Sequence, residues 1–147
     1  MKKRILIIGP NQKHNILVAE AIEQPNQPIR KVANISFTDE TIIVPSAYLE
    51  SPWMHKHIIS LQQKASKALF LVPIPSIKKT YPPNFACVLR VPVIGVALYE
   101  TNENKLEERG TAEKILEEIG CTNQQFFLHL NQEEIETFVE EISGKED

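Results

Sequence analysis

Hydrophobic residues along the chain fall into two alternating patterns: short continuous runs, and sets at helical spacing. The first run, from Lys3 to Ile8, ends at Gly9-Pro10, and such a run is typical of a central parallel strand that is buried on both faces. From His14 to Ile22 the apolar positions recur at helical spacing, and Pro25 prevents the helix from continuing further. The chain is therefore predicted to open with a strand, a turn and a helix.

The same alternation continues to the end of the chain. Ser51-Pro52 is a favourable helix start, because serine caps helices and proline is tolerated at their first position. Gly120 suits a left-handed helix end. The four prolines at 73, 75, 82 and 83 predict a long irregular loop. The remaining predicted elements are strands over residues 31–37, 41–44, 68–72, 91–98 and 126–130, and helices over residues 51–65, 105–119 and 132–142.

Strands that alternate with helices in this way predict an α/β fold with a mostly parallel sheet covered by helices on both faces. The short connection between the strands at 31–37 and 41–44 predicts a hairpin, and hence one antiparallel edge strand. We expect a three-layer, P-loop NTPase-like sandwich with six strands in the small-GTPase order 2-3-1-4-5-6. Residues 1–147 are predicted to form a single domain with an acidic tail from about residue 143.

Charge is distributed unevenly, although the net charge is only -3. Residues 1–99 carry 12 Lys/Arg and 5 Asp/Glu, whereas residues 100–147 carry 4 and 14. This asymmetry suits a protein or small-anion partner, although solvated acidic helices would produce it equally well. A partner would be sought at the edge strand, the Pro73–Pro83 loop or the acidic C-terminal helices. We expect no nucleic-acid partner and, since no apolar stretch could span a bilayer, no membrane association and a cytoplasmic location.

Aspartate is scarce: 17 of the 19 acidic residues are glutamates, and the two aspartates are Asp39 and Asp147. Sites that group several aspartates, such as receiver-domain phosphoacceptor sites and paired-aspartate two-metal sites, are therefore excluded.

The turn after the first strand has the position of a phosphate-binding P-loop but not its residues. The motif G-x-x-x-x-G-K-S/T uses glycines to expose backbone N–H groups, a lysine for phosphate oxygens and a hydroxyl for Mg²⁺. Gly9 is in place, whereas His14 replaces the second glycine, Asn15 the lysine and Ile16 the hydroxyl residue. Lys13 could still face an anion from a weak nest, or be a solvated loop residue. The segment is thus a degenerate Walker A loop whose candidate anion-binding residues are Gly9, Asn11, Gln12, Lys13, His14, Asn15 and Ile16.

Four segments carry a resemblance to a known family: residues 4–12, Pro45-Ser46-Ala47-Tyr48-Leu49-Glu50, Pro92-Val93-Ile94-Gly95, and Gly120 followed by Phe126-Phe127. In this order and spacing, the chain resembles the EutP/PduV family of ethanolamine and propanediol utilisation, small GTPase-fold proteins associated with bacterial microcompartments. The likeness runs from about Lys3 to Ile142. The second segment is the most specific, because the family reads D-T-P-G-E-Y-L-E there.

The departures from that family fall on residues of the nucleotide site. Ile43 stands where the family's switch aspartate would hold Mg²⁺, and Ser46 where its glycine would meet the γ-phosphate. The base-reading N/T-K-x-D segment is replaced by residues 98–101, and the later S-A element by Leu128-His129. Phosphoryl transfer depends on these electrostatic contacts, so ordinary GTP hydrolysis is not expected. The degenerate switch segment is represented by Pro45, Ser46, Tyr48 and Glu50.

The resemblance supports a non-catalytic pseudo-GTPase, an accessory or interaction protein of ethanolamine or propanediol utilisation, with microcompartment components as partners and no cofactor. The alternative is a phosphotransferase, such as an acetate-kinase-like enzyme, that binds ATP or GTP weakly through Lys13, with Glu50 or Glu100 as metal ligand. A sensor with a repurposed small-molecule pocket is a third hypothesis.

Histidines, cysteines and aromatic residues give weaker signals. His55 and His57 are two apart on a predicted helix and point in different directions, so we expect no shared metal site. His14 and His129 could meet at the carboxyl ends of strands, where α/β folds place ligands. Cys87 and Cys121 have no adjacent base in sequence and are interpreted as small core or surface residues. Trp53, Met54 and Tyr81 form either an exposed apolar patch or ordinary packing.

Overall fold

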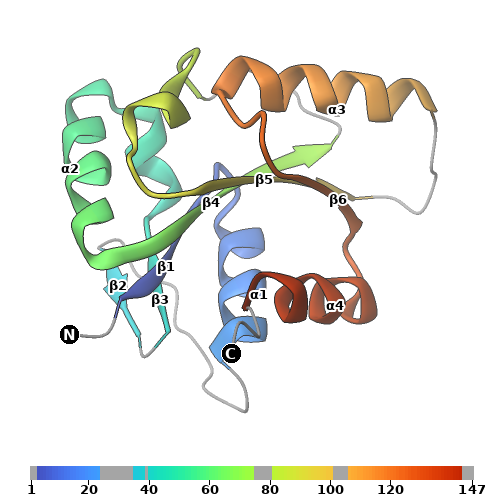
Figure 1. Ribbon diagram of the computed structural model, residues 1–147, viewed down its shortest axis with the longest axis horizontal. Helices are drawn as coiled ribbons and strands as arrows, with labels where there is room; N and C mark the ends of the chain where they lie inside the picture. Colours follow the sequence, from blue (N-terminus) through green and yellow to red (C-terminus); the bar gives the residue numbers. More distant parts are fainter. Residues whose placement is uncertain (1–2, 24–34, 39, 75–80, 101–105, 144–147) are drawn as a thin grey trace.

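The computed structural model describes residues 3–23, 35–38, 40–74, 81–100 and 106–143. Its centre is a six-stranded sheet in the order β2-β3-β1-β4-β5-β6 (Figure 1). Neighbouring strands are parallel except β2 and β3, which pair antiparallel. The predicted strand order and the single antiparallel edge strand are both confirmed. The strands are β1 (Arg4–Ile8), β2 (Ser36–Phe37), β3 (Thr41–Ile43), β4 (Ala65–Ile74), β5 (Val93–Tyr99) and β6 (Gln125–His129).

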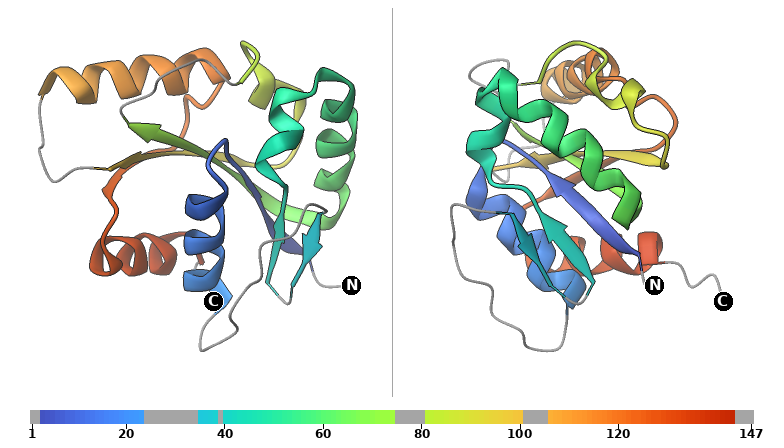
Figure 2. Two further views of the ribbon diagram at one scale, coloured as in Figure 1. Left: turned by 180° about the vertical axis from the view of Figure 1, so that it is seen from behind. Right: turned by 90° about the vertical axis from the view of Figure 1, so that its left-hand side faces the viewer.

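Helices cover both faces of this sheet. On one face lie α1 (Gln12–Glu23) and α4 (Gln132–Ser143), and on the other lie α2 (His55–Ser60) and α3 (Leu106–Ile119) (Figures 1 and 2). The two hydrophobic clusters agree with this division, since Ile7 packs with α1 and α4 residues while Leu6 and Ile8 pack with α2 and α3 residues. Successive strand residues point to opposite faces, so a strand covered on both sides is apolar at every position.

The segment predicted as one helix over residues 51–65 is instead divided into three short pieces. A 3-10 turn at Pro52–Met54 precedes α2, and a second at Leu61–Lys64 follows it. Ser51 makes no side-chain cap bond, and Trp53 is 71% exposed. The prediction was wrong because Ala65 already pairs with Arg4 in the sheet, so β4 begins three residues earlier than expected and shortens the helix.

Pro73 lies inside β4 rather than in the predicted loop, and the register explains why it is tolerated. Ala68 donates its N–H to Pro92 O, and Ile74 O accepts from Glu100 N–H, so even-numbered residues of β4 bond to β5. The nitrogen of Pro73 therefore faces the β1 side, beyond Ile8, which pairs with Phe70. No residue of β1 is paired with Pro73, so the missing N–H of proline removes no hydrogen bond of the sheet.

The other bounds differ by a few residues. Helix α1 begins at Gln12, two residues earlier than predicted, and strand β5 begins at Val93 rather than residue 91. Of the strand predicted over 31–37, residues 36–37 are strand and 31–34 lie outside the described residues. Gly120 has φ +108° and ends α3, as predicted. A 3-10 turn at Phe85–Val88 follows the predicted proline-rich loop, of which residues 75–80 lie outside the described residues.

The β2–β3 hairpin is fixed by a buried carboxylate at the end of α1. Glu23 Oε2 accepts hydrogen bonds from Thr38 Oγ1 (2.6 Å), Glu40 N (2.9 Å) and Thr41 Oγ1 (2.8 Å). Glu23 is 5% exposed. Because buried carboxylates are costly unless they are hydrogen-bonded, these three bonds make Glu23 a specific anchor for the antiparallel edge.

Candidate functional site

The predicted phosphate loop lies between β1 and α1, at the edge of the sheet where the parallel strands end (Figure 1). The same edge carries the degenerate switch segment after β3, Glu100 after β5 and His129 at the end of β6. The fold therefore brings together the segments singled out in the sequence. Ligands of open α/β sheets bind at this edge.

Asn11 caps the first turn of α1. Its Oδ1 accepts a hydrogen bond from His14 N–H at 3.1 Å, and its backbone O accepts from Asn15 N–H. Helix N-terminal N–H groups are the donors that a bound anion would use. The N–H of His14, which is one of these donors, is therefore already hydrogen-bonded within the protein.

Asn15, in the position of the P-loop lysine, is fully buried and folds back onto the loop. Its Nδ2 donates to Gly9 O at 3.0 Å. A Cβ placed on Gly9 would lie 2.3 Å from Asn15 Oδ1, so the amide occupies the space directly over the glycine. Among the described residues, Asn15 Oδ1 has no hydrogen-bond donor. Asn15 is thus bonded to the loop backbone, and its amide fills the turn.

Gln12 connects the loop to the degenerate switch segment. Its Oε1 accepts a hydrogen bond of 2.7 Å from the backbone N–H of Ser46. Ser46 stands where the resembled family has the glycine that meets the γ-phosphate. The N–H at that position is therefore engaged by a side chain of the protein itself.

The switch segment folds into a 3-10 helix, η1 (Ser46–Glu50). Pro45 is buried, Tyr48 is half-buried against the α2/α3-side core, and Glu50 is exposed. Tyr48 N–H donates to Pro45 O at 3.0 Å, which closes the first turn. Of this segment, Ser46 contacts the loop through its backbone, whereas Tyr48 contributes to the core.

His14 is buried and directed at the residue that follows β5. It is 7% exposed, and its Nε2 lies 3.4 Å from Glu100 Oε2. Burial lowers the pKa of His14, and the Glu100 carboxylate opposes this shift only in part. The imidazole is therefore neutral near pH 7. Within the described residues, its Nδ1 has no hydrogen-bond partner. Lys13 is exposed and Ile16 half-buried.

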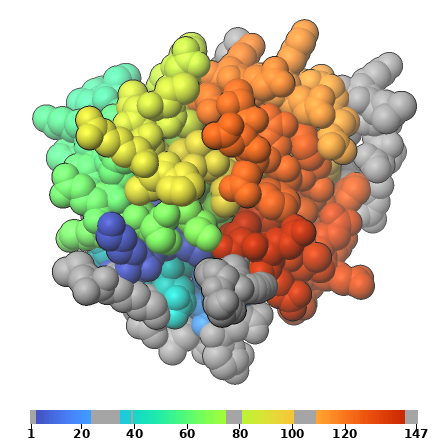
Figure 3. Space-filling model, in the orientation of Figure 1, coloured from blue at the N-terminus to red at the C-terminus, as the bar shows by residue number. Residues whose placement is uncertain are grey.

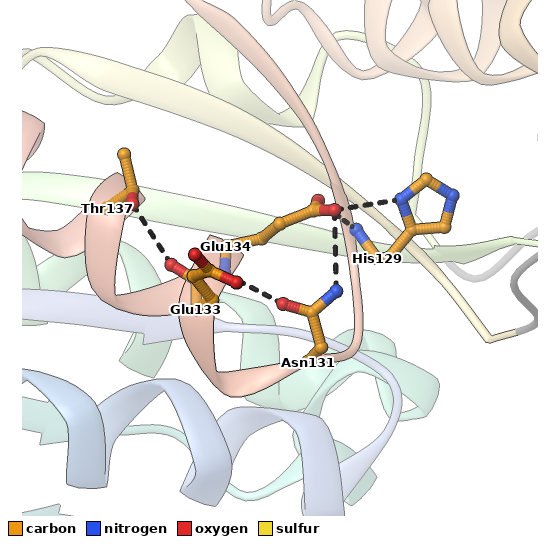
Figure 4. A network of polar contacts seen from close by, with 5 residues as sticks. All are labelled: His129, Asn131, Glu133, Glu134 and Thr137. Carbon is orange, nitrogen blue, oxygen red and sulfur yellow. Dashed lines mark hydrogen bonds and ion pairs between the residues drawn. The ribbon is translucent and has the colours of Figure 1, made fainter.

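A polar network links the end of β6 to the start of α4 (Figure 4). Glu134 Oε1 accepts from His129 N–H at 2.7 Å, and Glu134 Oε2 lies 3.2 Å from His129 Nδ1. Asn131 Oδ1 accepts from Glu134 N–H at 2.8 Å. The His129 backbone bond, more than any other contact, lowers the pKa of Glu134. Asn131 is thus the N-cap of α4, and Glu134 differs from the glutamate of a capping box because it accepts from His129 N–H and not from Asn131 N–H. The sequence signal for this cap is an asparagine three residues before a glutamate.

His14 and His129 lie at the same edge of the sheet, in separate sets of contacts. Tyr99, which precedes Glu100, packs its ring 5.4 Å from the ring of His129. Each histidine is matched with its own glutamate. The described part of the chain contains no group of three or more His, Cys, Asp or Glu side chains arranged to hold a metal ion.

Tyr81 is a residue of this edge that the sequence did not reveal. Its hydroxyl lies 2.9 Å from Ile8 O and 2.8 Å from Leu71 O, next to Gly9 at the end of β1. Of the two alternatives left open for Tyr81, ordinary packing is therefore the correct one, since its ring packs on Phe70 at 5.6 Å. The pairing of β1 with β4 ends at Ile8 and Phe70. The carbonyl groups of Ile8 and Leu71 therefore remain as acceptors for the Tyr81 hydroxyl.

The other singled-out residues lie away from this edge. His55 Nε2 is 2.9 Å from Leu49 O and its ring contacts Phe85, whereas His57 is exposed. Cys87 is exposed, and Cys121 is buried, which raises the pKa of the Cys121 thiol to about 12. None of the described helices is both long and apolar enough to cross a membrane.

A family model described as "Ethanolamine utilisation - propanediol utilisation" (PduV-EutP) matches residues 1–143. The chain belongs to the PduV-EutP family. Membership implies a role in ethanolamine or propanediol utilisation, and the six-stranded sheet agrees with the NTPase-like fold expected of the family. No curated protein matches the chain.

Proposed function

We propose that this chain is a non-catalytic member of the PduV-EutP family, a pseudo-GTPase that acts as an accessory or interaction protein in ethanolamine or propanediol utilisation. As part of the proposal, its partners are proteins of the same system, and it works in the cytoplasm at a microcompartment. It needs no metal or nucleotide for this role.

The observation that carries the proposal is the occupation of the loop by the protein's own side chains. Asn15 fills the space over Gly9, Gln12 engages the N–H of Ser46, and Asn11 caps α1. A nucleotide would have to displace these hydrogen bonds, and each one stabilises the protein by roughly 0.5–1.5 kcal/mol.

A bound nucleotide would gain little electrostatic stabilisation from this site to offset the loss of those hydrogen bonds. In the described loop and switch segment Lys13 is the only Lys or Arg, and no aspartate is present at the switch position to hold Mg²⁺. Phosphoryl transfer is catalysed almost entirely by positioning and electrostatic stabilisation. A site without those charges offers little transition-state stabilisation, which favours the accessory role over a phosphotransferase.

Genetic complementation tests this function. The gene is deleted in its own host, and growth on ethanolamine and on propanediol is compared after return of the wild-type gene or of Lys13→Ala. A non-catalytic accessory protein requires that both genes restore growth equally, with equal protein levels on immunoblots. Restoration by wild type but not by Lys13→Ala would show that the loop cation is needed, as a phosphotransferase requires.

A further inference from the structure

A row of cations lies at the edge of the sheet opposite the phosphate loop, where the parallel strands begin. Arg4 starts β1, Lys64 directly precedes β4, and Arg90 lies shortly before β5. Lys3 adds a further exposed cation beside Arg4. In Figure 3 the start of the chain, the start of β4 and the segment before β5 follow one another across this face. We name Lys3, Arg4, Lys64 and Arg90, together with Phe37, the amino-edge stripe.

Phe37 is the aromatic member of the stripe. It is 46% exposed at the end of the edge strand β2. The Arg4 guanidinium carbon lies 5.9 Å and the Lys64 ammonium nitrogen 5.3 Å from the centre of its ring. Cations at such distances are attracted by the face of the ring, which holds them beside an apolar surface.

Two residues of the stripe, Arg4 and Arg90, are fixed by hydrogen bonds. Arg4 Nε donates to Thr38 O, and Arg90 N–H donates to Gln62 Oε1 at 2.6 Å. Within the part of the chain that the structure describes, none of the four cations forms an ion pair. Nearby, the Glu23 carboxylate is buried in its bonds to the hairpin. The stripe therefore presents cations that form no ion pair with a described carboxylate.

The strand order sets the length of the surface. Phe37 on β2 and Arg90 before β5 are separated by four strand spacings, which amount to about 19 Å at roughly 4.8 Å each. An extended peptide advances about 3.3 Å per residue, so about six or seven residues span the stripe. Carboxylates on alternate residues of such a peptide would lie about 7 Å apart on one side, which can face the stripe.

We propose that the amino-edge stripe binds an acidic, extended segment of a partner protein, with an apolar side chain of that segment against Phe37. Charge complementarity supports this occupant. A nucleic acid is disfavoured because four cations and one aromatic ring give little stacking or counterion release. The stripe and the phosphate loop lie at opposite edges, so this inference stands or fails separately from the proposed function.

Fluorescence anisotropy tests the inference with a labelled heptapeptide, L-A-E-A-E-A-E, whose leucine and glutamates lie on one side of an extended chain, and its glutamine counterpart, L-A-Q-A-Q-A-Q, as control. We expect the acidic peptide to bind the full chain, and to bind less as NaCl is raised from about 50 to about 300 mM. The double variant Lys64→Glu/Arg90→Glu is expected to weaken binding more than about tenfold, and Phe37→Ser about threefold. The matched variant Lys114→Glu, an exposed lysine on α3, should change it less than about twofold.

Circular dichroism and thermal melting of each variant show that the fold is retained. Equal binding of the two peptides, or unchanged binding by the folded double variant, would overturn the proposal. It would also be overturned if a single-stranded heptanucleotide or phosphatidylserine vesicles bound the stripe more tightly than the acidic peptide. Sedimentation velocity adds one further outcome: oligomers of wild type that the double variant lacks would show that the occupant is a second copy of this chain instead.

Discussion

The contact between Gly9 and Asn15 gives the sharpest structural prediction. A Cβ added at Gly9 would lie 2.3 Å from Asn15 Oδ1 and 3.1 Å from Leu71 Cβ, inside a fully buried region. Gly9→Ala therefore forces the amide aside, and overpacking of this kind costs about 1–3 kcal/mol of unfolding free energy. Asn15→Ala removes the bond to Gly9 O and is expected to cost about 1–2 kcal/mol.

The double variant distinguishes a filled loop from two independent effects. With Asn15→Ala in place, the new methyl group of Gly9→Ala enters the space that the amide has left, so the two costs should not add. We expect the double variant to be more stable than the sum predicts by about 1 kcal/mol or more, as contacting residues commonly show. Urea denaturation followed by circular dichroism measures all four proteins.

Gly110 provides the matched control for this cycle. A Cβ at Gly110, on α3, meets no atom within 4 Å. Gly110→Ala should therefore stabilise the protein by about 0.5–1 kcal/mol and should add to Asn15→Ala within about 0.5 kcal/mol. Additive costs for Gly9→Ala and Asn15→Ala would refute the reasoning, because the amide would then not occupy the loop.

Three further changes test other contacts. Glu23→Ala removes the acceptor of three hydrogen bonds and should lower the unfolding free energy by about 2–4 kcal/mol in urea; a loss below about 1 kcal/mol would contradict its role as an anchor. Gly120→Ala introduces a Cβ at φ +108° and 2.8 Å from Cys87 Sγ, so a drop of several degrees in the thermal midpoint is expected, and an unchanged midpoint would count against the cap. The pKa of His14 lies below 6.5, so the unfolded chain binds a proton before the folded one does, and stability should fall as pH decreases from about 7 to about 5.5. His14→Gln should reduce this fall, while His57→Gln, at an exposed position, should not; identical pH profiles for all three proteins would exclude His14 as the source.

The sequence predicted the fold well because most of its signals are local. Strands β1, β4 and β5 are buried on both faces and appear as continuous apolar runs, while the hairpin and the glycine at the end of α3 have recognisable turn residues. The errors came from pairing between distant segments. Whether Pro73 can lie in a strand depends on which neighbour its nitrogen faces, and that is set by the register with β1.

The features of the candidate site also fall into two groups: those that can be read from single positions of the sequence, and those that depend on contacts made in the folded protein. The loss of the lysine, the hydroxyl and the aspartate could be read directly from residues 15, 16 and 43. The contacts found there instead are the hydrogen bond from Ser46 N–H to Gln12 and the 3.4 Å approach of His14 to Glu100. Both join residues far apart in sequence and depend on the folded edge of the sheet. The Asn131–Glu134 cap is local and could have been predicted.

Isothermal titration calorimetry with GTP and with ATP, each with Mg²⁺, tests the central claim most directly. If the loop is filled by Gln12 and Asn15 and lacks its cation, neither nucleotide should bind more tightly than about 100 μM. A dissociation constant clearly below that value, abolished by Lys13→Ala in a protein that remains folded, would contradict the account.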